Sequence, residues 1–241
     1  MLIIATAGWS IPRACASQFA GAGTHLERYA QVLRGVEINS SFYREHAATT
    51  YVRWASLTPR HFRFAAKLPR EITHELRLRA SRRPLQAFLA SVGGLGRRMG
   101  PLVVQLPPSL AFEARVARTF FAVLRDLYAG PVVCEPRHAS WFEDRTDALL
   151  SGFSVARVAA DPAVVPAAAD PGGWPGLIYY RLHGSPRMYW SVYDAARIGT
   201  WTQALRRVPR RIPAWCVFDN TASSGAMVNA LQMRTGAMRK T

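Results

Sequence analysis

Lysine is nearly absent from this 241-residue chain, and acidic residues are scarce. The sequence holds two lysines, Lys67 and Lys240, beside twenty-nine arginines. Aspartate and glutamate number 15 against 31 basic residues, which leaves a formal net charge of +16. This balance is typical of proteins that meet polyanions. A GC-rich coding bias would explain arginine in place of lysine, but it does not explain the shortage of acids.

Cysteines are few and long apolar runs are missing. Cys15, Cys134 and Cys216 show no CxxC or CxxH spacing, and two of them fall in apolar segments. No apolar run approaches the roughly 20 residues that a transmembrane helix needs. Residues 1–7 lack the basic start and the apolar length of a signal peptide. We therefore expect a cytoplasmic protein with buried, reduced thiols and no membrane partner.

Eight short apolar runs, most of them ending in polar residues, alternate with segments of helical periodicity. The runs are residues 2–7, 36–39, 62–67, 101–106, 131–135, 155–161, 177–183 and 214–220. The helical segments are residues 24–33, 48–57, 84–93, 112–128, 141–150, 194–207 and 222–234. Thr24 and Glu27 fit a capping box at the first helix. The loop 162–175 is expected to cover the site or to hold a short helix.

This strand–helix order predicts an α/β fold, a (β/α)₈ TIM barrel, in a single domain over residues 1–241. Reactive groups of such barrels lie at the carboxyl ends of the strands. Successive strand residues point to opposite faces, so residues two apart share a face. The pairs that share a face are Glu37 with Asn39, Glu135 with Arg137, and Arg181 with His183. We expect these side chains to point into the barrel mouth, and Val36, Ile38, Tyr180 and Leu182 to pack under helices.

The predicted mouth carries proton carriers and anion-binding groups. Lys67, Glu135 and His183 are the candidate catalytic residues, as proton carriers whose pKa values burial can adjust. Lys67 is singled out because a chain that otherwise uses arginine places an amine there, and an amine can lose its proton. The alternative for Lys67 is a structural ion pair. The candidate ligand-binding residues are Glu37, Asn39, Tyr43, His74, Gln105, Arg137, His138, Asp161, Arg181, Asp219 and Asn220.

Several motifs together resemble the domain-of-unknown-function 72 family, also called YecE-like. They are Gly8-Trp9, residues 36–43 (VEINSSFY), 62–70 (FRFAAKLPR), 72–74 (ITH), 100–102 with 105–109 (QLPPS), 135–142 (EPRHASWF), 160–161, 180–184 (YRLHG) and 229–231. The resemblance implies a TIM barrel, loosely similar to sugar isomerases and to an abasic-site endonuclease family, and implies no particular reaction. Asp219-Asn220 departs from the paired asparagines frequent in the family, and residues 5–7 depart from its opening motif.

Three functions follow from these residues. We expect an enzyme, a hydrolase, lyase or isomerase, that acts on a phosphorylated or other anionic substrate, with Arg137 and Arg181 as the anion clamp. Lys67 also offers a Schiff-base amine for a carbonyl substrate. No cofactor is identified, and a divalent metal held by the carboxylates and histidines is a less favoured alternative. The other alternative is a nonenzymatic nucleic-acid-binding protein.

The nucleic-acid alternative depends on charge and aromatic rings. Arg70, Arg77, Arg79, Arg82 and Arg83 follow the third predicted strand and would supply phosphate contacts. Stacking surfaces would come from Phe42, Tyr43, Trp141, Tyr189, Trp190 and Tyr193. The same aromatic residues are as readily explained as core or loop anchors.

Overall fold

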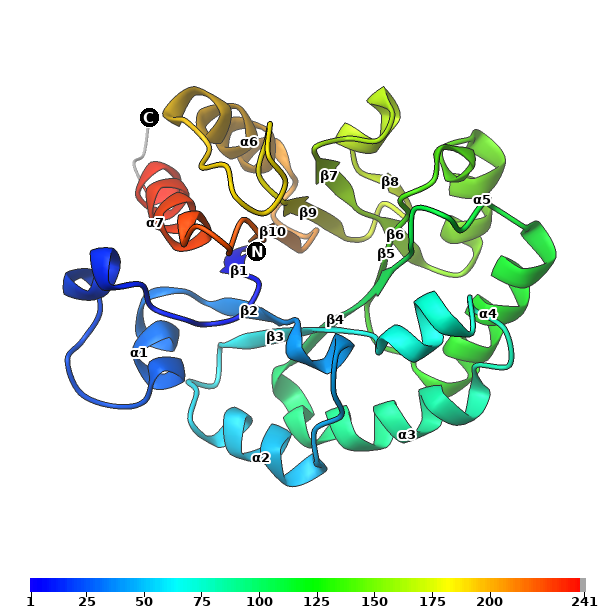
Figure 1. The fold of residues 1–241 in the computed structure, drawn as a ribbon, viewed down its shortest axis with the longest axis horizontal. Helices are drawn as coiled ribbons and strands as arrows, with labels where there is room; N and C mark the ends of the chain where they lie inside the picture. Colours follow the sequence, from blue (N-terminus) through cyan, green and yellow to red (C-terminus); the bar gives the residue numbers. More distant parts are fainter. Residues whose placement is uncertain (239–241) are drawn as a thin grey trace.

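The computed structural model describes residues 1–238, in which helices surround a central set of strands (Figure 1). The helices are α1 (His25–Val32), α2 (Ala48–Ser56), α3 (Arg82–Val92), α4 (Ala114–Leu127), α5 (Asp144–Gly152), α6 (Ala195–Arg207) and α7 (Gly225–Met238). The strands are β1 (Leu2–Thr6), β2 (Gly35–Ile38), β3 (Arg63–Lys67), β4 (Met99–Gln105), β5 (Val132–Glu135), β6 (Val155–Arg157), β7 (Ala159–Asp161), β8 (Gly172–Gly173), β9 (Ile178–Leu182) and β10 (Ala214–Phe218). Lys240 lies outside the described residues.

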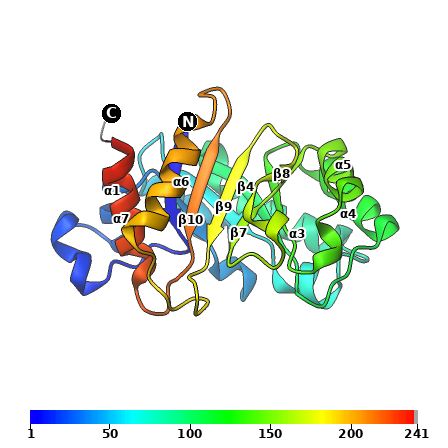
Figure 2. The same ribbon diagram turned by 90° about the horizontal axis from the view of Figure 1, so that it is seen from above.

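Backbone hydrogen bonds group the described strands into two sheets. One sheet has the order β1-β10-β9-β7 and the other the order β2-β3-β4-β5-β6-β8. All pairings are parallel except that of β6 with the short β8. Figure 2 shows β10 and β9 side by side, with α6 and α7 nearby. The α/β fold agrees with the prediction, whereas this sheet topology does not display one closed eight-stranded barrel.

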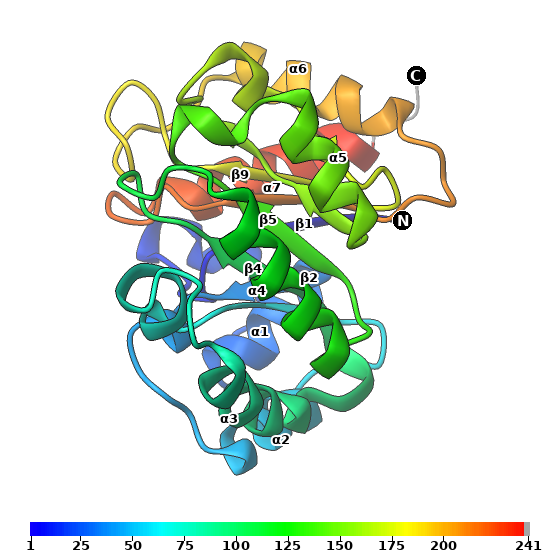
Figure 3. The same cartoon turned by 90° about the vertical axis from the view of Figure 1, so that its right-hand side faces the viewer.

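The break between the sheets lies in the predicted strand 155–161. Val158 separates β6 from β7, so that β6 pairs with β5 while β7 pairs with β9. On the other side, Ala7 and Glu37 form an isolated parallel bridge between the ends of β1 and β2. Figure 3 shows α6 and α7 at one end of the molecule and α2 and α3 at the other.

Local sequence explains several element boundaries. The Thr24 hydroxyl accepts a hydrogen bond from the Glu27 N–H, and the Glu27 carboxylate accepts one from the Thr24 N–H, which confirms the predicted capping box at α1. The loop 162–175 contains a short 3-10 helix, Pro166–Ala169, followed by β8, as one of its two predicted forms requires. None of the helices within residues 1–238 is long and apolar enough to cross a membrane.

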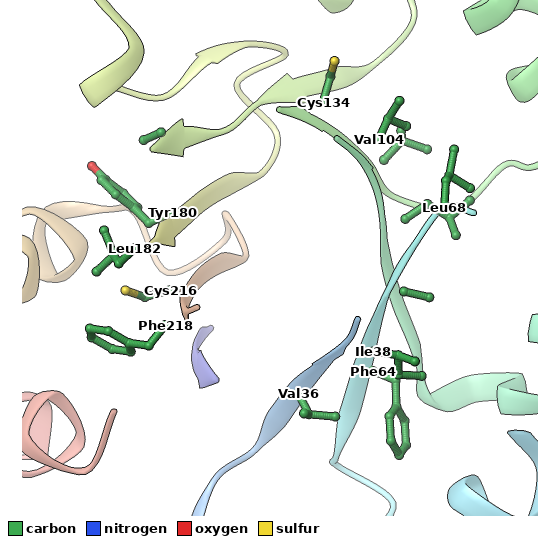
Figure 4. Packing of buried hydrophobic residues seen from close by; sticks show 14 of the residues in the cluster. Val36, Ile38, Phe64, Leu68, Val104, Cys134, Tyr180, Leu182, Cys216 and Phe218 are labelled. Atoms are coloured by element: carbon green, nitrogen blue, oxygen red, sulfur yellow. The ribbon is translucent and has the colours of Figure 1, made fainter. Parts of the chain in front are cut away.

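Strand alternation divides the core into two clusters. The larger cluster holds the residues that point toward the helices, such as Val36, Ile38, Cys134, Tyr180 and Leu182 (Figure 4). The smaller cluster holds alternate residues of the same strands on the opposite, inner face: Ile3, Ala5, Ala65, Val103, Val133, Ala156, Val158, Tyr179, Trp215 and Val217, with Leu177. Val36, Ile38, Tyr180 and Leu182 therefore pack as predicted.

Trp215 fills the inner face near the amino ends of the strands, where two glycines leave room for its ring. A Cβ atom at Gly35 would lie 2.5 Å from Ile3 Cγ2 and 3.1 Å from Trp215 Cη2, and one at Gly100 would lie 2.9 Å from Trp215 Cζ2. Contacts below 3 Å force the surrounding side chains or backbone to shift.

Gly35→Ala is therefore expected to lower the free energy of unfolding by about 1–3 kcal/mol, the usual cost of overpacking. Gly199→Ala is the matched control, because Gly199 lies inside α6 and a Cβ there meets nothing within 4 Å. The control should gain roughly 0.5–1 kcal/mol of helix propensity. Urea unfolding of both variants measures the difference, and equal stabilities would contradict the packing argument.

Candidate functional site

The inner face changes character toward the carboxyl ends of the strands. Its largely apolar residues give way to polar or charged ones two positions further along: Ala65 to Lys67, Val103 to Gln105, Val133 to Glu135, Tyr179 to Arg181 and Val217 to Asp219. Glu37 occupies the same position on β2. All six of these polar residues are buried, and Glu37, Glu135 and Arg181 have no exposed surface. A cluster of buried charges therefore lies at the strand ends, where the sequence predicts the site.

Arg181 is the centre of this cluster. Its Nε and Nη2 atoms donate to the two carboxylate oxygens of Glu37, at 3.0 and 2.6 Å. Nη2 also donates to Asp219 Oδ2 at 3.2 Å, and Nη1 donates to Glu135 Oε2. Nη1 lies 3.4 Å from Gln105 Oε1. One guanidinium thus joins three carboxylates, which its planar fork of five N–H donors makes possible.

Glu135 is held as a carboxylate by three donors. Arg137 Nε donates to its Oε1 at 2.6 Å, His183 Nε2 lies 2.9 Å from the same oxygen, and Arg181 contacts Oε2. Burial raises the pKa of Glu135, but the charges of Arg137 and Arg181 outweigh burial and hold the pKa well below its usual range. Burial likewise raises the pKa of Asp219, and Arg181 outweighs it, so the net shift is downward. Both groups remain acceptors at neutral pH.

His183 connects the carboxylates with Arg137. Its Nδ1 lies 3.0 Å from Asp219 Oδ2, and its Nε2 lies 2.9 Å from both Glu135 Oε1 and Arg137 Nη2. With a proton on Nδ1 alone, Nε2 accepts a hydrogen bond from Arg137; with both nitrogens protonated, the ring donates to both carboxylates. Both ring nitrogens of His183 therefore have polar partners within hydrogen-bond distance.

Lys67 differs from the other cations of the cluster. Its side chain is 5% exposed, and its ammonium group makes no ion pair or hydrogen bond with any residue in 1–238. The ammonium nitrogen lies over the Phe42 ring, 3.8 Å from the ring centre. Burial, followed by the positive charge of Arg181, lowers the pKa of Lys67 to about 8. The structural ion pair considered for Lys67 is therefore not formed.

His74 lies beside Lys67, on a π-helical turn, Glu71–Glu75, that follows β3. Its ring contacts Phe42 edge-on at 4.9 Å, and its Nδ1 lies 2.8 Å from the Thr73 hydroxyl. Burial, followed by the charges of Lys67, Arg70 and Arg137, lowers the pKa of His74 to about 4. A neutral imidazole thus stands among several cations, so the local field at this edge of the cluster is positive.

Other predicted site residues make contacts outside the charged cluster. Asp161 accepts from the Tyr193 hydroxyl at 2.8 Å and from Arg197 Nη2 at 2.5 Å. Asn220 donates to Ser191 O and Asn229 Oδ1, both at 2.9 Å. These contacts tie Asp161 and Asn220 to the loop before α6, to α6 itself and to α7.

Three predicted residues lie in loops at this end of the strands. Asn39 directly follows β2 with helical backbone angles, and its buried Oδ1 has no hydrogen-bond partner within the described chain. Tyr43 is 74% exposed and contacts Phe42 edge-on. His138 Nδ1 accepts from the Ser140 N–H at 3.2 Å and thereby caps a short 3-10 turn.

Tyr179 belongs to the cluster although it was not among the predicted residues. Its hydroxyl donates to Glu37 Oε2 at 2.9 Å, and its ring stacks on Trp215. Burial and the Glu37 charge raise the pKa of Tyr179 well above its usual range, so the hydroxyl stays protonated. Its spacing of two residues from Arg181 was the available signal, since the two side chains share a face.

The carboxylates of the cluster face arginine, histidine and tyrosine donors. Within residues 1–238, no group of three or more His, Cys, Asp or Glu side chains is placed to hold a metal ion. The arrangement therefore offers two cations, Lys67 and Arg137, of which Lys67 can lose its proton near neutral pH. The charges of Arg181, Glu37, Glu135 and Asp219 are paired with one another.

Comparison with known proteins places the chain in a family. Residues 3–240 match the family model described as "Protein of unknown function DUF72". The UPF0759 protein YecE of Escherichia coli strain K12 is 34% identical over 84 residues, which span 35% of this chain and 31% of YecE.

Two solved structures share the fold. A DUF72 family protein of Enterococcus faecalis V583 superposes with a TM-score of 0.82 at 19% identity. The superposition covers 100% of this chain and 97% of the Enterococcus chain. One from Thermotoga maritima MSB8 also gives 0.82, at 22% identity, covering 99% and 100%. At these identities the likeness concerns the fold alone. On the strength of the family match over nearly its whole length, this chain belongs to the DUF72 family.

Proposed function

We propose that this protein is an enzyme that acts on a phosphorylated or otherwise anionic small molecule by acid–base or hydrolytic chemistry at the carboxyl ends of the strands. The observation that carries the proposal is the ammonium group of Lys67, which is buried and forms no ion pair within residues 1–238, although the carboxylates of Glu37, Asp219 and Glu135 partly offset the lowering of its pKa. A buried charge without a partner is costly, and such a cost is ordinarily retained where a ligand supplies the missing charge.

Arg137 completes the proposed anion site. Its guanidinium uses Nε for Glu135 and Nη2 for His183, while the sole hydrogen-bond contact of Nη1 with the described residues is the thioether of Met188, at 3.7 Å. The charges of Lys67 and Arg137 both lower the pKa of His74, which supports a shared site for the two cations. An incoming phosphate or carboxylate would replace the weak sulfur contact and neutralise Lys67.

The proposed roles follow from the pKa shifts. Lys67 is the proton carrier, because its pKa of about 8 lies near working pH. His183 is assigned a positioning role by geometry, since its ring nitrogens contact Asp219, Glu135 and Arg137. Glu135 is assigned a fixed negative charge that orients Arg137 and His183, since its pKa moves away from neutrality. Arg181 holds Glu135 in place and is itself held by Glu37 and Gln105.

We also infer that the two sheets form one closed (β/α)₈ barrel in a single domain. Three contacts support closure: the Ala7–Glu37 bridge, the Gly8 N–H to Glu37 carbonyl bond of 2.8 Å, and the Val158 N–H to Cys134 carbonyl bond of 2.8 Å. With β6 and β7 counted as one interrupted strand, the order returns to its starting point. The ring of polar strand ends then surrounds a single mouth.

Binding of inorganic phosphate, measured by titration calorimetry between pH 6 and 10, tests the proposed site. Above pH 8, where phosphate is already a dianion, affinity should fall, because Lys67 loses its charge as the pH passes its pKa of about 8. A bound anion stabilises the ammonium form and moves this fall to higher pH in the complex. Lys67→Arg should bind phosphate without the fall near pH 8, since arginine keeps its charge. Equal affinities for the wild type and Lys67→Ala would refute the proposal.

Nucleic-acid binding is the second candidate, and a surface groove supports it. The groove, of about 810 Å³, lies between the residues before α3 and the start of α4, and Arg79, Arg82, Arg83 and Arg115 line it. Two of these arginines form exposed ion pairs, Arg79 with Glu113 and Arg82 with Asp126. Long DNA or RNA that binds with a steep salt dependence, undiminished by Lys67→Ala, would favour this candidate over the enzyme.

A further inference from the structure

Aromatic side chains stand exposed in two loops at the carboxyl ends of the strands. Tyr43, in the loop after β2, is 74% exposed, and Tyr189 and Trp190, in the loop after β9, are 38% and 47% exposed. Exposed aromatic rings that gather beside a cluster of charges are typical of ligand and partner sites. Trp190 already has the Arg187 guanidinium 4.5 Å from its ring centre.

Tyr189 is held in a backbone conformation that bulky residues avoid. Its φ is +68°, in the left-handed region. The Tyr189 N–H donates to the His183 carbonyl, and the Tyr189 carbonyl accepts from the Ala222 N–H at 3.0 Å. Such a conformation costs about 1–3 kcal/mol and persists only where the surroundings impose it, as they do at ligand sites. Glycine would adopt the same angles without that cost.

The strained loop places the Tyr189 ring directly beside the charged cluster. The ring meets the His183 ring edge-to-face, with 5.8 Å between centres and 81° between planes. The preceding residue, Met188, contacts Arg137 through its sulfur. On the other side of the cluster, Phe42 lies under Lys67 and against Tyr43. The cations proposed to bind the anion thus lie between two loops that each present an exposed tyrosine.

We propose that Tyr189 is a stacking surface and that this site takes small anions bearing a flat aromatic or heteroaromatic ring, as mononucleotides and aryl phosphates do. The inference rests on the proposed function, because Lys67 and Arg137 hold the anionic group while Tyr189 holds the ring. Stacking of a base on an aromatic side chain contributes about 1–3 kcal/mol, which corresponds to roughly 5- to 150-fold in affinity. Ligands with the same phosphate and no ring should bind correspondingly less tightly.

Calorimetric titrations with AMP, phenyl phosphate, ribose 5-phosphate and inorganic phosphate at pH 7 provide the test. The wild type should bind AMP and phenyl phosphate at least about ten-fold more tightly than ribose 5-phosphate. Tyr189→Phe should keep this preference. Tyr189→Gly should abolish it and, by relieving the strained backbone, raise the Tm by about 2–4 °C. Loss of selectivity with a gain in stability separates a ligand contact from a structural one.

Ala80→Gly is the matched control, because Ala80 also has a positive φ, +48°, and lines the surface groove before α3. It should raise the Tm and leave the ring preference unchanged. Equal binding of AMP and ribose 5-phosphate, or a preference that survives in Tyr189→Gly, would overturn the inference while leaving the phosphate site standing. Binding of oligothymidylate alone would overturn it in favour of a polymer. Failure of every phosphate to bind would overturn the proposed function as well.

Discussion

Replacement of Arg181 by alanine is expected to lower the free energy of unfolding by about 3–5 kcal/mol at pH 7, the usual cost of breaking a buried ion pair from one side. The substitution leaves Glu37, Glu135 and Asp219 without the guanidinium that joins them. Urea unfolding followed by circular dichroism measures the loss. Arg82→Ala, which breaks the exposed pair with Asp126, is the control and should change the stability by no more than about 1 kcal/mol.

The difference in the free energy of unfolding between the wild type and Arg181→Ala should become smaller as the pH is lowered. In the wild type, the lowered pKa values of Glu135 and Asp219 contribute stability that is present above their unfolded values and is lost as the pH falls through the folded values. In the variant, burial without Arg181 favours the protonated carboxyls, so acid no longer removes the same stability. A gap that stays constant from pH 7 to pH 3 would show that Arg181 acts through packing alone.

Alternation along the strands predicted most of the buried cluster. Glu37, Glu135, Arg181 and His183 were assigned to one mouth from the spacing of charged residues, and the structure brings them together with Asp219. The same rule explains why Asp161 and Asn220 lie elsewhere. Ala156 and Val158 face inward, so Asp161 faces the helices and pairs with Arg197, and Asn220, next to the inward Asp219, reaches Asn229 of α7. A strict count of parity would have excluded both.

Loop geometry and sheet continuity were beyond what the pattern of residues determines. Tyr43, His74 and His138 follow strands, but no periodicity fixes a side chain once the strand has ended. The interruption at Val158 was equally invisible, because neither glycine nor proline breaks residues 155–161, which read as one strand despite Arg157. The strain at Tyr189 depends on hydrogen bonds to His183 and Ala222, which lie on other segments of the chain. These features arise from tertiary contacts, which a single sequence does not encode locally.

Lys67→Met is expected to stabilise the protein at pH 7 by about 3–4 kcal/mol while it removes phosphate binding. The pKa of Lys67 falls from 10.5 to about 8 on folding, and each unit corresponds to about 1.4 kcal/mol. Methionine has a similar length, carries no charge and packs well against the Phe42 ring. In the wild type, the cost of burying the Lys67 ammonium is paid in full below about pH 8. Between pH 8 and 10.5 this cost shrinks, because the amine of the folded protein has already lost its proton. The stability gain should therefore disappear as the pH rises through that window.

Arg137→Met, at the second proposed anion-binding residue, is expected to lower the stability that Lys67→Met raises. Arg137 is paired with Glu135 at 2.6 Å, so its loss leaves a buried carboxylate with one donor fewer and should cost about 3–5 kcal/mol. Both variants should lose phosphate affinity, because each removes one of the two proposed contacts. Unfolding in urea at pH 7 and pH 10 distinguishes them from each other. If Lys67→Met were destabilising to the same degree as Arg137→Met, Lys67 would be part of the structural ion network. The proposal that a bound anion neutralises Lys67 would then be wrong.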